Sequence, residues 1–332
     1  MKILVTGSSG LIGSTVCPLL EKDGHIVRRF DIRPPSLEIG TTYFRTEELT
    51  DSEDRRRAIK GIDGVIHLAA VSRVLDAELD PSKCIDVNVR GTMELLHDIA
   101  KMDKTPWVIY GSSREVYGAA SSIPVSEDQP LKPVNVYGES KVVAEYLVGN
   151  YSRSTKSPSI IFRFSNVYGS IHDHATRVIP AFVRAPLTGS AIRIDGEDNI
   201  FDFTHVDDTA RAIRAAVDHI EDGRLTGIET MNVASGRGTT LIQLARLIKL
   251  ISGTDIPIIK GKPREFDVDH FIGNPYRLEN NLGVRCKIPL HVGIQRLLND
   301  LRTNINRTLN ITEIPGKTSR NMIEAVMQVV SL

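Results

Sequence analysis

An apolar run, a glycine-rich turn and a helical segment follow one another at the N-terminus, and this succession constrains the fold more than any other feature. The run KILVT leads into Gly7, Gly10 and Gly13, after which residues 14–23 have helical character. Glycines permit a tight turn and let the backbone approach a pyrophosphate, while the helix start offers free N–H groups and a positive dipole end. Alternatively, the glycines serve only the backbone angles of a tight turn that binds no phosphate. We interpret this loop as a phosphate-binding loop.

The surroundings of the loop favour a dinucleotide over a mononucleotide. The loop follows the first predicted strand, no Gly-Lys-Ser/Thr sequence comes after it, and Asp31 ends the next apolar run. An acid at this place accepts hydrogen bonds from the adenosine ribose and repels a 2′-phosphate, which favours NAD over NADP. Arg33 could instead bind that phosphate. We expect NAD, because the acid at the strand end usually decides.

Apolar runs bounded by turn signals alternate with helical segments in the first half of the chain. The runs are KILVTG, HIVRRFD, GVIHLAA, WVIYGSS and SIIFRFS, and residues 88–102 are typical of the helices between them. This alternation predicts an α/β fold, with a Rossmann-type doubly wound parallel sheet over residues 1–169. Shorter runs predict a smaller mixed α/β C-terminal substrate domain over residues 170–302, some segments of which can return to the first domain. Residues 303–332 are expected to form an appended tail.

Composition and charge exclude several classes of protein. Lys plus Arg and Asp plus Glu both number 41, and the absence of a basic block argues against nucleic acid as a partner. The three cysteines are far apart and lack metal-ligand spacing, so we expect a reducing compartment and no metal site. The apolar run at the N-terminus is too short for a signal peptide or a membrane span, and we therefore expect a cytoplasmic protein with no membrane partner.

Tyr137 and Lys141 stand four positions apart in YGESK, and on a helix they would share a face. A lysine ammonium and the positive nicotinamide ring stabilise a phenolate, which would lower the pKa of Tyr137 and allow it to act as a general base. Ser113 ends the run WVIYGSS, at the edge where open α/β sheets present ligand groups. Alone, this spacing also fits a solvated tyrosine with a lysine neighbour. Its predicted place after the fifth strand, together with the dinucleotide loop, favours an active site.

With these motifs the chain resembles the extended short-chain dehydrogenases/reductases, specifically the NAD-dependent epimerase/dehydratase family, which acts on nucleotide sugars. The resemblance runs through TGSSGLIG, GVIHLAA, NVRGT, GSSREVYG, YGESK, RFSNVYG, FDFTHVDD, MNVASG and LGV. It implies that Ser113, Tyr137 and Lys141 form the catalytic set. It also implies that the cofactor is surrounded by Tyr137, Lys141, Gly7, Gly10, Leu11, Ile12, Gly13, Asp31, Ile32, Arg33, Glu48, Leu49, Leu68, Ala69, Ala70 and Asn88.

The same resemblance assigns substrate contacts. Asn166 in RFSNVYG and Arg264 in KPREFD match positions that contact the nucleotide diphosphate, for which a guanidinium is well suited. Arg73 and Arg177 are further candidates, and Ser113 is expected to bond the sugar oxygen. A capping amide and surface arginines are the alternative explanations. The resemblance further implies a homodimer, formed through helical faces within residues 93–102 and 142–151.

Two positions depart from the family pattern. Phe201 stands where the family usually carries a diphosphate-binding arginine, and it could stack on the substrate or fill the core. Glu115 matches a glutamate of sugar dehydratases and uronate decarboxylases, where a carboxylate can abstract the C5 proton of a 4-keto sugar. The dehydratases also carry an aspartate where this chain has Arg114, so the full dehydratase set is absent. Glu115 is either catalytic or the partner of Arg114 in a structural ion pair.

These residues favour an NAD-dependent epimerase that oxidises C4 of a nucleotide-linked hexose and returns the hydride to the opposite face. If Glu115 is catalytic, the keto sugar would instead undergo dehydration, decarboxylation or C5 epimerisation. A net reductase is another enzymatic alternative. A dinucleotide-sensing regulator is the alternative outside enzymes, since a fold does not fix a function.

Overall fold

The computed structural model describes residues 1–34, 46–263 and 268–312. Its largest element is a six-stranded sheet in which all neighbouring strands run parallel. In spatial order the strands are β2 (Ile26–Phe30), β1 (Lys2–Thr6), β3 (Gly64–His67), β4 (Trp107–Ser113), β5 (Ser159–Phe164) and β9 (Ile228–Val233). The five apolar runs of the first half form β1 to β5. The predicted Rossmann-type α/β fold is thereby confirmed.

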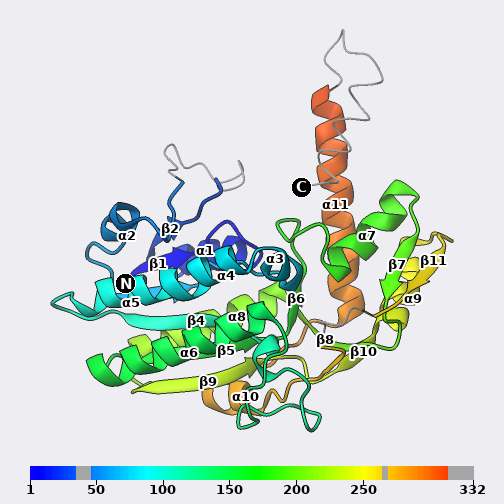
Figure 1. The fold of residues 1–332 in the computed structure, drawn as a ribbon. Coiled ribbons are helices and arrows are strands. Elements are labelled where there is room, and N and C mark those ends of the chain that lie inside the picture. Colours follow the sequence, from blue (N-terminus) through cyan, green and yellow to red (C-terminus); the bar gives the residue numbers. More distant parts are fainter. Residues whose placement is uncertain (35–45, 264–267, 313–332) are drawn as a thin grey trace.

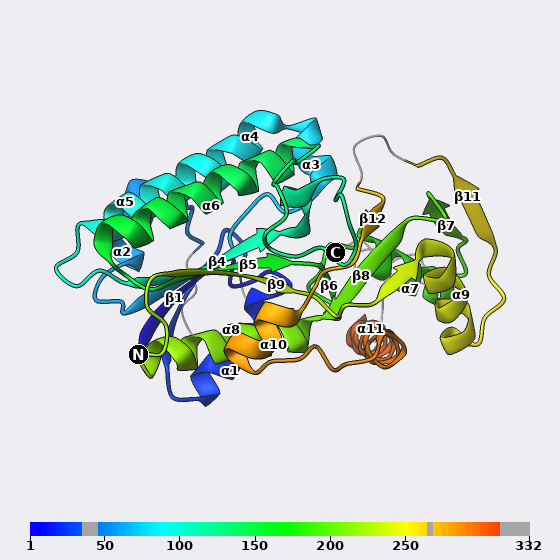
Figure 2. The same cartoon turned by 90° about the horizontal axis from the view of Figure 1, so that it is seen from below.

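Helices cover both faces of this sheet, as Figure 2 shows. One face carries α3 (Val74–Leu79), α4 (Pro81–Ile85), α5 (Thr92–Ala100) and α6 (Val136–Thr155), with a π-helical turn (Asp86–Gly91) before α5. The other face carries α1 (Gly13–Lys22), α8 (Val206–Glu221) and α10 (Tyr276–Leu282). The short helix α2 (Ser52–Ala58) packs against α5. Because both faces are covered, every residue of β3, β4 and β5 is buried, as their continuous apolar runs require.

The order of the strands determines where a ligand can bind. Strand β1 lies between β2 and β3, so the chain leaves β1 in one direction and later returns to its other side. The connections therefore diverge above the carboxyl ends of β1 and β3. Ligands of open α/β sheets bind in the crevice formed at such a reversal.

A second, smaller unit lies beyond one end of the sheet (Figure 1). Its strands are β6 (Asn166–Tyr168), β7 (Ile192–Asp195), β8 (Ile200–His205), β10 (Gly238–Thr240), β11 (Ile258–Gly261) and β12 (His270–Phe271). Its helices are α7 (Val178–Thr188), α9 (Leu241–Ser252) and α11 (Leu290–Thr312). Phe182, Ile194, Leu244 and Leu297 belong to its own apolar core.

The chain crosses between the two units several times after residue 170. Strand β9 pairs with β5, and helices α8 and α10 cover the six-stranded sheet, so these segments belong with the first unit. Helix α11 begins at Leu290 and packs Ile294, Leu297 and Leu301 into the second core. The same helix continues to Thr312, past the boundary expected at 303. Among the described residues, no helix is both long and apolar enough to cross a membrane.

Candidate functional site

A cavity of about 980 Å³ opens at the predicted reversal point and extends between the two units. Predicted cofactor residues that line it are Gly7, Gly10, Leu11, Ile12, Gly13, Asp31, Ile32, Arg33, Glu48, Leu49, Leu68, Ala69, Ala70, Tyr137 and Lys141. Predicted catalytic and substrate residues that line it are Arg73, Ser113, Glu115, Asn166 and Arg177. Arg264 lies outside the described residues. The structure therefore places predicted cofactor, catalytic and substrate residues, which are distant in the sequence, around one cavity.

The backbone of the glycine loop packs so closely against itself and the segment after β3 that Gly7 and Gly13 have no space for a side chain. A Cβ atom on Gly13 would lie 2.2 Å from the carbonyl oxygen of Gly7, and one on Gly7, whose φ is +71°, would lie 2.8 Å from the backbone nitrogen of Ala69. Helix α1 starts at Gly13 with Ile12 as its N-cap residue, without a side-chain cap and without an acid in its first turn. The helix N-terminus is thus open to an anion, and the loop fits a pyrophosphate.

Asp31 is held at the end of β2 by the same loop. Its carboxylate accepts backbone hydrogen bonds from Ser9 and Arg33, each at 2.9 Å, and the side chain is buried. The Arg33 guanidinium lies 3.7 Å from this carboxylate and is half exposed at the cavity. The acid thus has a fixed position from which it can accept ribose hydroxyls, as a dinucleotide requires.

Asn88 is the one predicted cofactor residue that does not line the cavity. Its side chain is buried, accepts a hydrogen bond from the backbone of Val71 at 2.8 Å, and donates to Val71 and to Ser140. It therefore ties the segment after β3 to helix α6 from behind the cavity wall. Its contact with the cofactor stays a prediction, and these hydrogen bonds fix its side chain within the π-helical turn.

Ser113, Tyr137 and Lys141 meet at the centre of the cavity. Ser113 ends β4, and Tyr137 lies in the first turn of α6, whose N-cap Asn135 accepts a hydrogen bond from Gly138 at 2.8 Å. Tyr137 and Ser113 both line the cavity, and the Ser113 side chain acts to lower the pKa of Tyr137. Helix α6 lies between β4 and β5, so Tyr137 follows the fourth strand and not the fifth, which corrects the predicted position.

Lys141 lies under Tyr137 on the same face of α6. Its Nζ donates to the carbonyl oxygen of Gly111 at 2.8 Å and lies 5.8 Å from the ring centroid of Tyr137. Burial lowers the pKa of Lys141 from 10.5 to about 8, so the lysine is still mostly charged at neutral pH. The ammonium is available to hold a hydroxyl or to influence the phenol.

In the protein without NAD, the pKa of Tyr137 lies above its ordinary value, whereas the prediction concerned the site with the nicotinamide ring bound. Burial raises it from 10.0 to about 12, and the positive charge of Arg177 and the hydrogen bond with Ser113 offset part of that rise. The prediction counted the positive neighbours but not the desolvation of the phenolate, which is the larger effect here. In the protein alone, Tyr137 is a neutral phenol.

The titration of Lys141 predicts a pH-dependent stability. Its folded pKa lies below its unfolded value, so the unfolded chain binds more protons between pH 8 and 10.5, and stability rises with pH in that window. In the NAD-free protein, the unfolding free energy of the wild type should gain up to about 3 kcal/mol relative to Lys141→Met across it. Urea unfolding of both proteins between pH 7 and 10 measures this. A difference in unfolding free energy between the two proteins that stays constant with pH would contradict this prediction.

Glu115 and Arg114 form an ion pair beside this centre. Arg114 Nη2 lies 2.8 Å from Glu115 Oε1, and Asn135 donates to Glu115 Oε2 at 3.0 Å. Both charged side chains are buried. The guanidinium carbon lies 4.8 Å from the ring centroid of Phe201, which packs edge-on against Phe203. Phe201 therefore fills the core of the second unit and supports Arg114 at the cavity wall.

Asn166 and Arg177 present polar groups from the second unit. The Oδ1 of Asn166 is buried and finds no hydrogen-bond donor among the described residues, as expected of a group that meets a ligand. Arg177 donates to the backbone oxygen of Ser72 at 2.8 Å and to Asp173 at 3.3 Å, and so bridges the two units. Arg73 pairs with Asp76 at 2.9 Å.

Asp173 and His174 were missed in the sequence, although both line the cavity. Asp173 is buried and accepts from Arg177 and from the backbone of His174. Burial, helped by the positive charges of three nearby arginines, lowers the pKa of His174 from 6.5 to about 4, so this imidazole is neutral. The run HDHATR, which is separated from RFSNVYG by two residues, was the available signal.

Known proteins share this arrangement. Residues 3–234 match the NAD dependent epimerase/dehydratase family. A UDP-glucose 4-epimerase of Lactobacillus helveticus is 27% identical over 316 residues, which cover 86% of this chain and 92% of that protein. The structure of a Thermotoga maritima UDP-glucose 4-epimerase with UDP-glucose has a TM-score of 0.83 and 28% identity, covering 92% and 100% of the two chains.

A dTDP-glucose 4,6-dehydratase of Streptomyces venezuelae, solved with NAD, matches with a TM-score of 0.83 and 25% identity, covering 92% of this chain and 98% of its own. The likeness to both kinds of enzyme spans the cavity and both units. Since the family model covers more than half of the chain and the glycine loop and Asp31 fit the dinucleotide, the chain is an NAD-using enzyme that belongs to the NAD-dependent epimerase/dehydratase family.

Proposed function

We propose that the protein is a nucleotide-sugar 4-epimerase, which oxidises C4 of a nucleotide-linked hexose and reduces it again from the opposite face. The observation that carries this proposal is the placement of Ser113, Tyr137 and the buried Lys141 together at the junction of the cofactor and substrate parts of one cavity. UDP-glucose 4-epimerases among its relatives support it.

Bound NAD supplies the acceptor and then the donor of the hydride. As a phenolate, Tyr137 would take the proton of the C4 hydroxyl and become a neutral phenol, and it would return that proton to the C4 oxygen when C4 is reduced. The charge of Arg177 opposes the burial that raises the pKa of Tyr137, and the positive charge of a bound nicotinamide ring would act in the same direction. Ser113 donates to the sugar oxygen and orients it. Lys141 holds the cofactor ribose.

The diphosphate of the substrate is expected to meet the second unit. Asn166 offers a buried acceptor without a partner among the described residues, and Arg177 offers a guanidinium between the units. Arg264 and Arg73 complete the proposed set. These groups replace the arginine that is absent at Phe201.

Glu115 is the basis of the alternative activities, and its contacts weigh against them. These activities need a carboxylate that can reach the C5 proton, whereas Glu115 is held by Arg114 through one oxygen and by Asn135 through the other. Dehydration, decarboxylation and C5 epimerisation are therefore second to 4-epimerisation. A net reductase and a dinucleotide-sensing regulator lack a comparable supporting contact.

The decisive experiment uses purified protein and a panel of UDP-, dTDP-, GDP- and CDP-hexoses and hexuronates, with and without added NAD. We expect one pair of C4 epimers to interconvert to the same equilibrium from both sides without net consumption of NAD. Release of water or carbon dioxide would instead establish the Glu115 chemistry. No conversion of any sugar would refute the proposal.

We also propose a homodimer formed through α4, α5 and α6. These helices share one face of the sheet and expose large side chains, namely Ile85, Met93, Val143 and Tyr146. Burying such a patch in a symmetric contact is the usual reason for its exposure on a folded enzyme.

The variant Tyr146→Glu should shift the protein from dimer to monomer, because it places a charge in the centre of the proposed contact. Sedimentation velocity at micromolar concentration measures the change. Tyr276→Glu, at an exposed tyrosine of α10 on the opposite face of the sheet, is the matched control. A wild-type protein that sediments as a monomer would rule out the dimer.

A further inference from the structure

A buried polar cluster lies directly behind the active-site residues. Oε1 of Glu145 accepts a hydrogen bond from Ser112 at 2.5 Å and another from Nε of Arg163 at 3.0 Å, and Oε2 accepts from Nη2 of Arg163 at 2.7 Å. All three side chains are more than nine-tenths buried. Ser112 belongs to β4, Glu145 to α6 and Arg163 to β5. We call these three residues the α6 clamp.

The α6 clamp acts on the elements that carry the active-site residues. Ser112 precedes Ser113, and Glu145 lies one helical turn after Lys141 on the same face of α6. Lys141 itself donates to Gly111, the residue before Ser112. Two successive turns of α6 are therefore attached to two successive residues of β4. A displacement of the helix along the strand would break both attachments.

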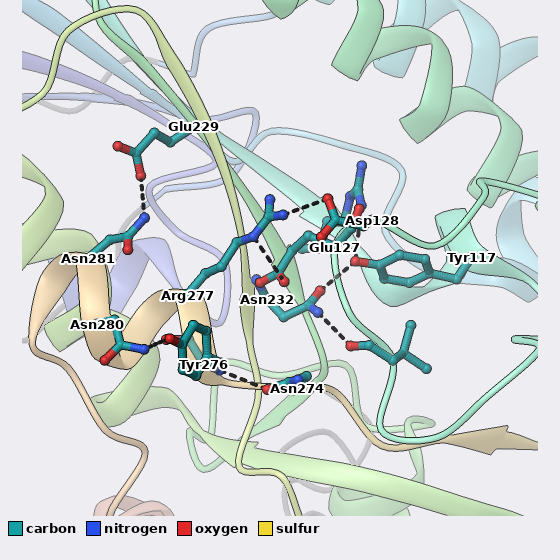
Figure 3. Close-up of polar contacts among 12 residues, drawn as sticks. Tyr117, Glu127, Asp128, Glu229, Asn232, Asn274, Tyr276, Arg277, Asn280 and Asn281 are labelled. Carbon is teal, nitrogen blue, oxygen red and sulfur yellow. Dashed lines mark hydrogen bonds and ion pairs between the residues drawn. The ribbon is translucent and has the colours of Figure 1, made fainter.

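Further contacts fix the guanidinium of the α6 clamp. Nη1 of Arg163 donates to the hydroxyl of Tyr117 at 3.0 Å and to the backbone oxygen of Glu127 at 3.1 Å. The Tyr117 hydroxyl in turn donates to Asn232 at 2.7 Å, and the backbone of Asn232 donates to the Glu127 carboxylate at 2.7 Å (Figure 3). Arg277 of α10 lies 3.6 Å from that carboxylate. Arg163 is thus held in one orientation by β9 and by the segment that leads into α6.

Stability alone is a weak explanation for such a cluster. Desolvation offsets most of the attraction in a buried ion pair, and apolar side chains of similar volume are often as stabilising. What the pair adds is a defined geometry, since two parallel N–H···O contacts form in one arrangement of the partners. We propose that Glu145 is a positioning residue, which through Ser112 and Arg163 sets the distance between Ser113 and the pair Tyr137 and Lys141. This inference rests on the proposed hydride transfer.

The charge of Glu145 also acts on Lys141. It raises the pKa of that lysine and so opposes the lowering caused by burial. The other titratable groups around the ammonium belong to β3, β4, α4 and α6, and they are His67, Tyr110, Cys84 and Tyr137. Removing the carboxylate charge should therefore let Lys141 lose its proton at lower pH.

The test compares Glu145→Gln and Ser112→Ala with the wild type. For Glu145→Gln we expect kcat to fall about 10- to 100-fold at nearly unchanged KM, because a shift of about 1 Å can cost 100-fold in rate. The alkaline limb of its pH profile should move to lower pH. Ser112→Ala leaves the ion pair intact, so it should fold normally, lower kcat less and leave that limb in place.

Asp208→Asn is the matched control, since Asp208 is a buried carboxylate paired with Arg211 on the opposite face of the sheet and does not line the cavity. The Asp208→Asn variant should keep its kcat within about twofold of the wild type, and it should lose about as much folding stability as Glu145→Gln does. Equal loss of kcat in the control, or wild-type kcat in both α6 clamp variants, would overturn the inference. If the wild type converts no nucleotide sugar, the proposed function fails, and the inference is then tested by unfolding. In Glu145→Gln, the rise of the unfolding free energy with pH that Lys141 causes must move to lower pH. If that rise stays where it is in the wild type, the inference is refuted.

Discussion

Replacing Tyr137 by phenylalanine should lower kcat about 10²- to 10⁴-fold, the range that a positioned acid or base contributes. The ring keeps its volume in the apolar cluster with Ala77 and Cys84, so the fold and the cavity should remain. What disappears is the phenolic hydroxyl, the group proposed to carry the C4 proton. Steady-state turnover of the identified sugar, with NAD content measured on the same sample, tests this prediction.

The control for this variant is Tyr151→Phe. Tyr151 is buried on the same helix, and its hydroxyl donates to the backbone of Pro106 at 2.5 Å, away from the cavity. Its loss should cost about 1 kcal/mol of stability and leave kcat unchanged. Turnover by Tyr137→Phe within about tenfold of the wild type, with NAD bound, would assign the proton transfer to another group.

Replacing Gly13 by alanine should remove most of the affinity for NAD. The added Cβ would lie 2.2 Å from the oxygen of Gly7 and 2.6 Å from the Cα of Ser8, and both are backbone atoms that cannot rotate away. The loop must open, and overpacking of this kind costs about 1–3 kcal/mol. If this free energy destabilises the loop conformation that binds NAD, the Kd for NAD rises about 10- to 100-fold. Calorimetric titration of NAD-free protein measures the change.

Gly189→Ala separates this effect from general strain. Gly189 ends α7 with a φ of +69°, and no atom lies within 4 Å of the position that its Cβ would take. The variant should lose about 1–2 kcal/mol through its backbone angle and bind NAD as the wild type does. Wild-type affinity for NAD in Gly13→Ala would show that the loop tolerates a side chain at that position.

Local patterns in the sequence predicted the first unit well. The runs KILVT and WVIYGSS are strands because their residues are buried on both faces, and the glycines after KILVT mark a close approach that the structure reproduces. Tyr137 and Lys141 share a helix face because their spacing matches the helical period. These features depend on a few neighbouring residues, and a single sequence carries that information.

Other features depend on contacts between distant segments. The raised pKa of Tyr137 in the NAD-free protein follows from burial by several elements, which its neighbours in the sequence do not reveal. The contact of Glu115 with Asn135, twenty residues away, could likewise not be read from the sequence, and the sugar panel chooses between the two roles of Glu115. Glu145 and Arg163 carried no recognisable pattern, because their pairing exists only once α6 lies across β4 and β5.

The repeated crossing of the chain between the two units limits how this enzyme can be recombined with its relatives. A chimera that exchanged residues 170–302 as one block would also exchange β9, which completes the six-stranded sheet, and α8 and α10, which cover it. Substrate preference would therefore have to be transplanted as separate inserts, such as the stretch from β6 to β8 and the stretch from β10 to β12. Evolution of new sugar specificities in such a chain is correspondingly expected to proceed through substitutions at the cavity wall, as at Phe201, and not through exchange of whole domains.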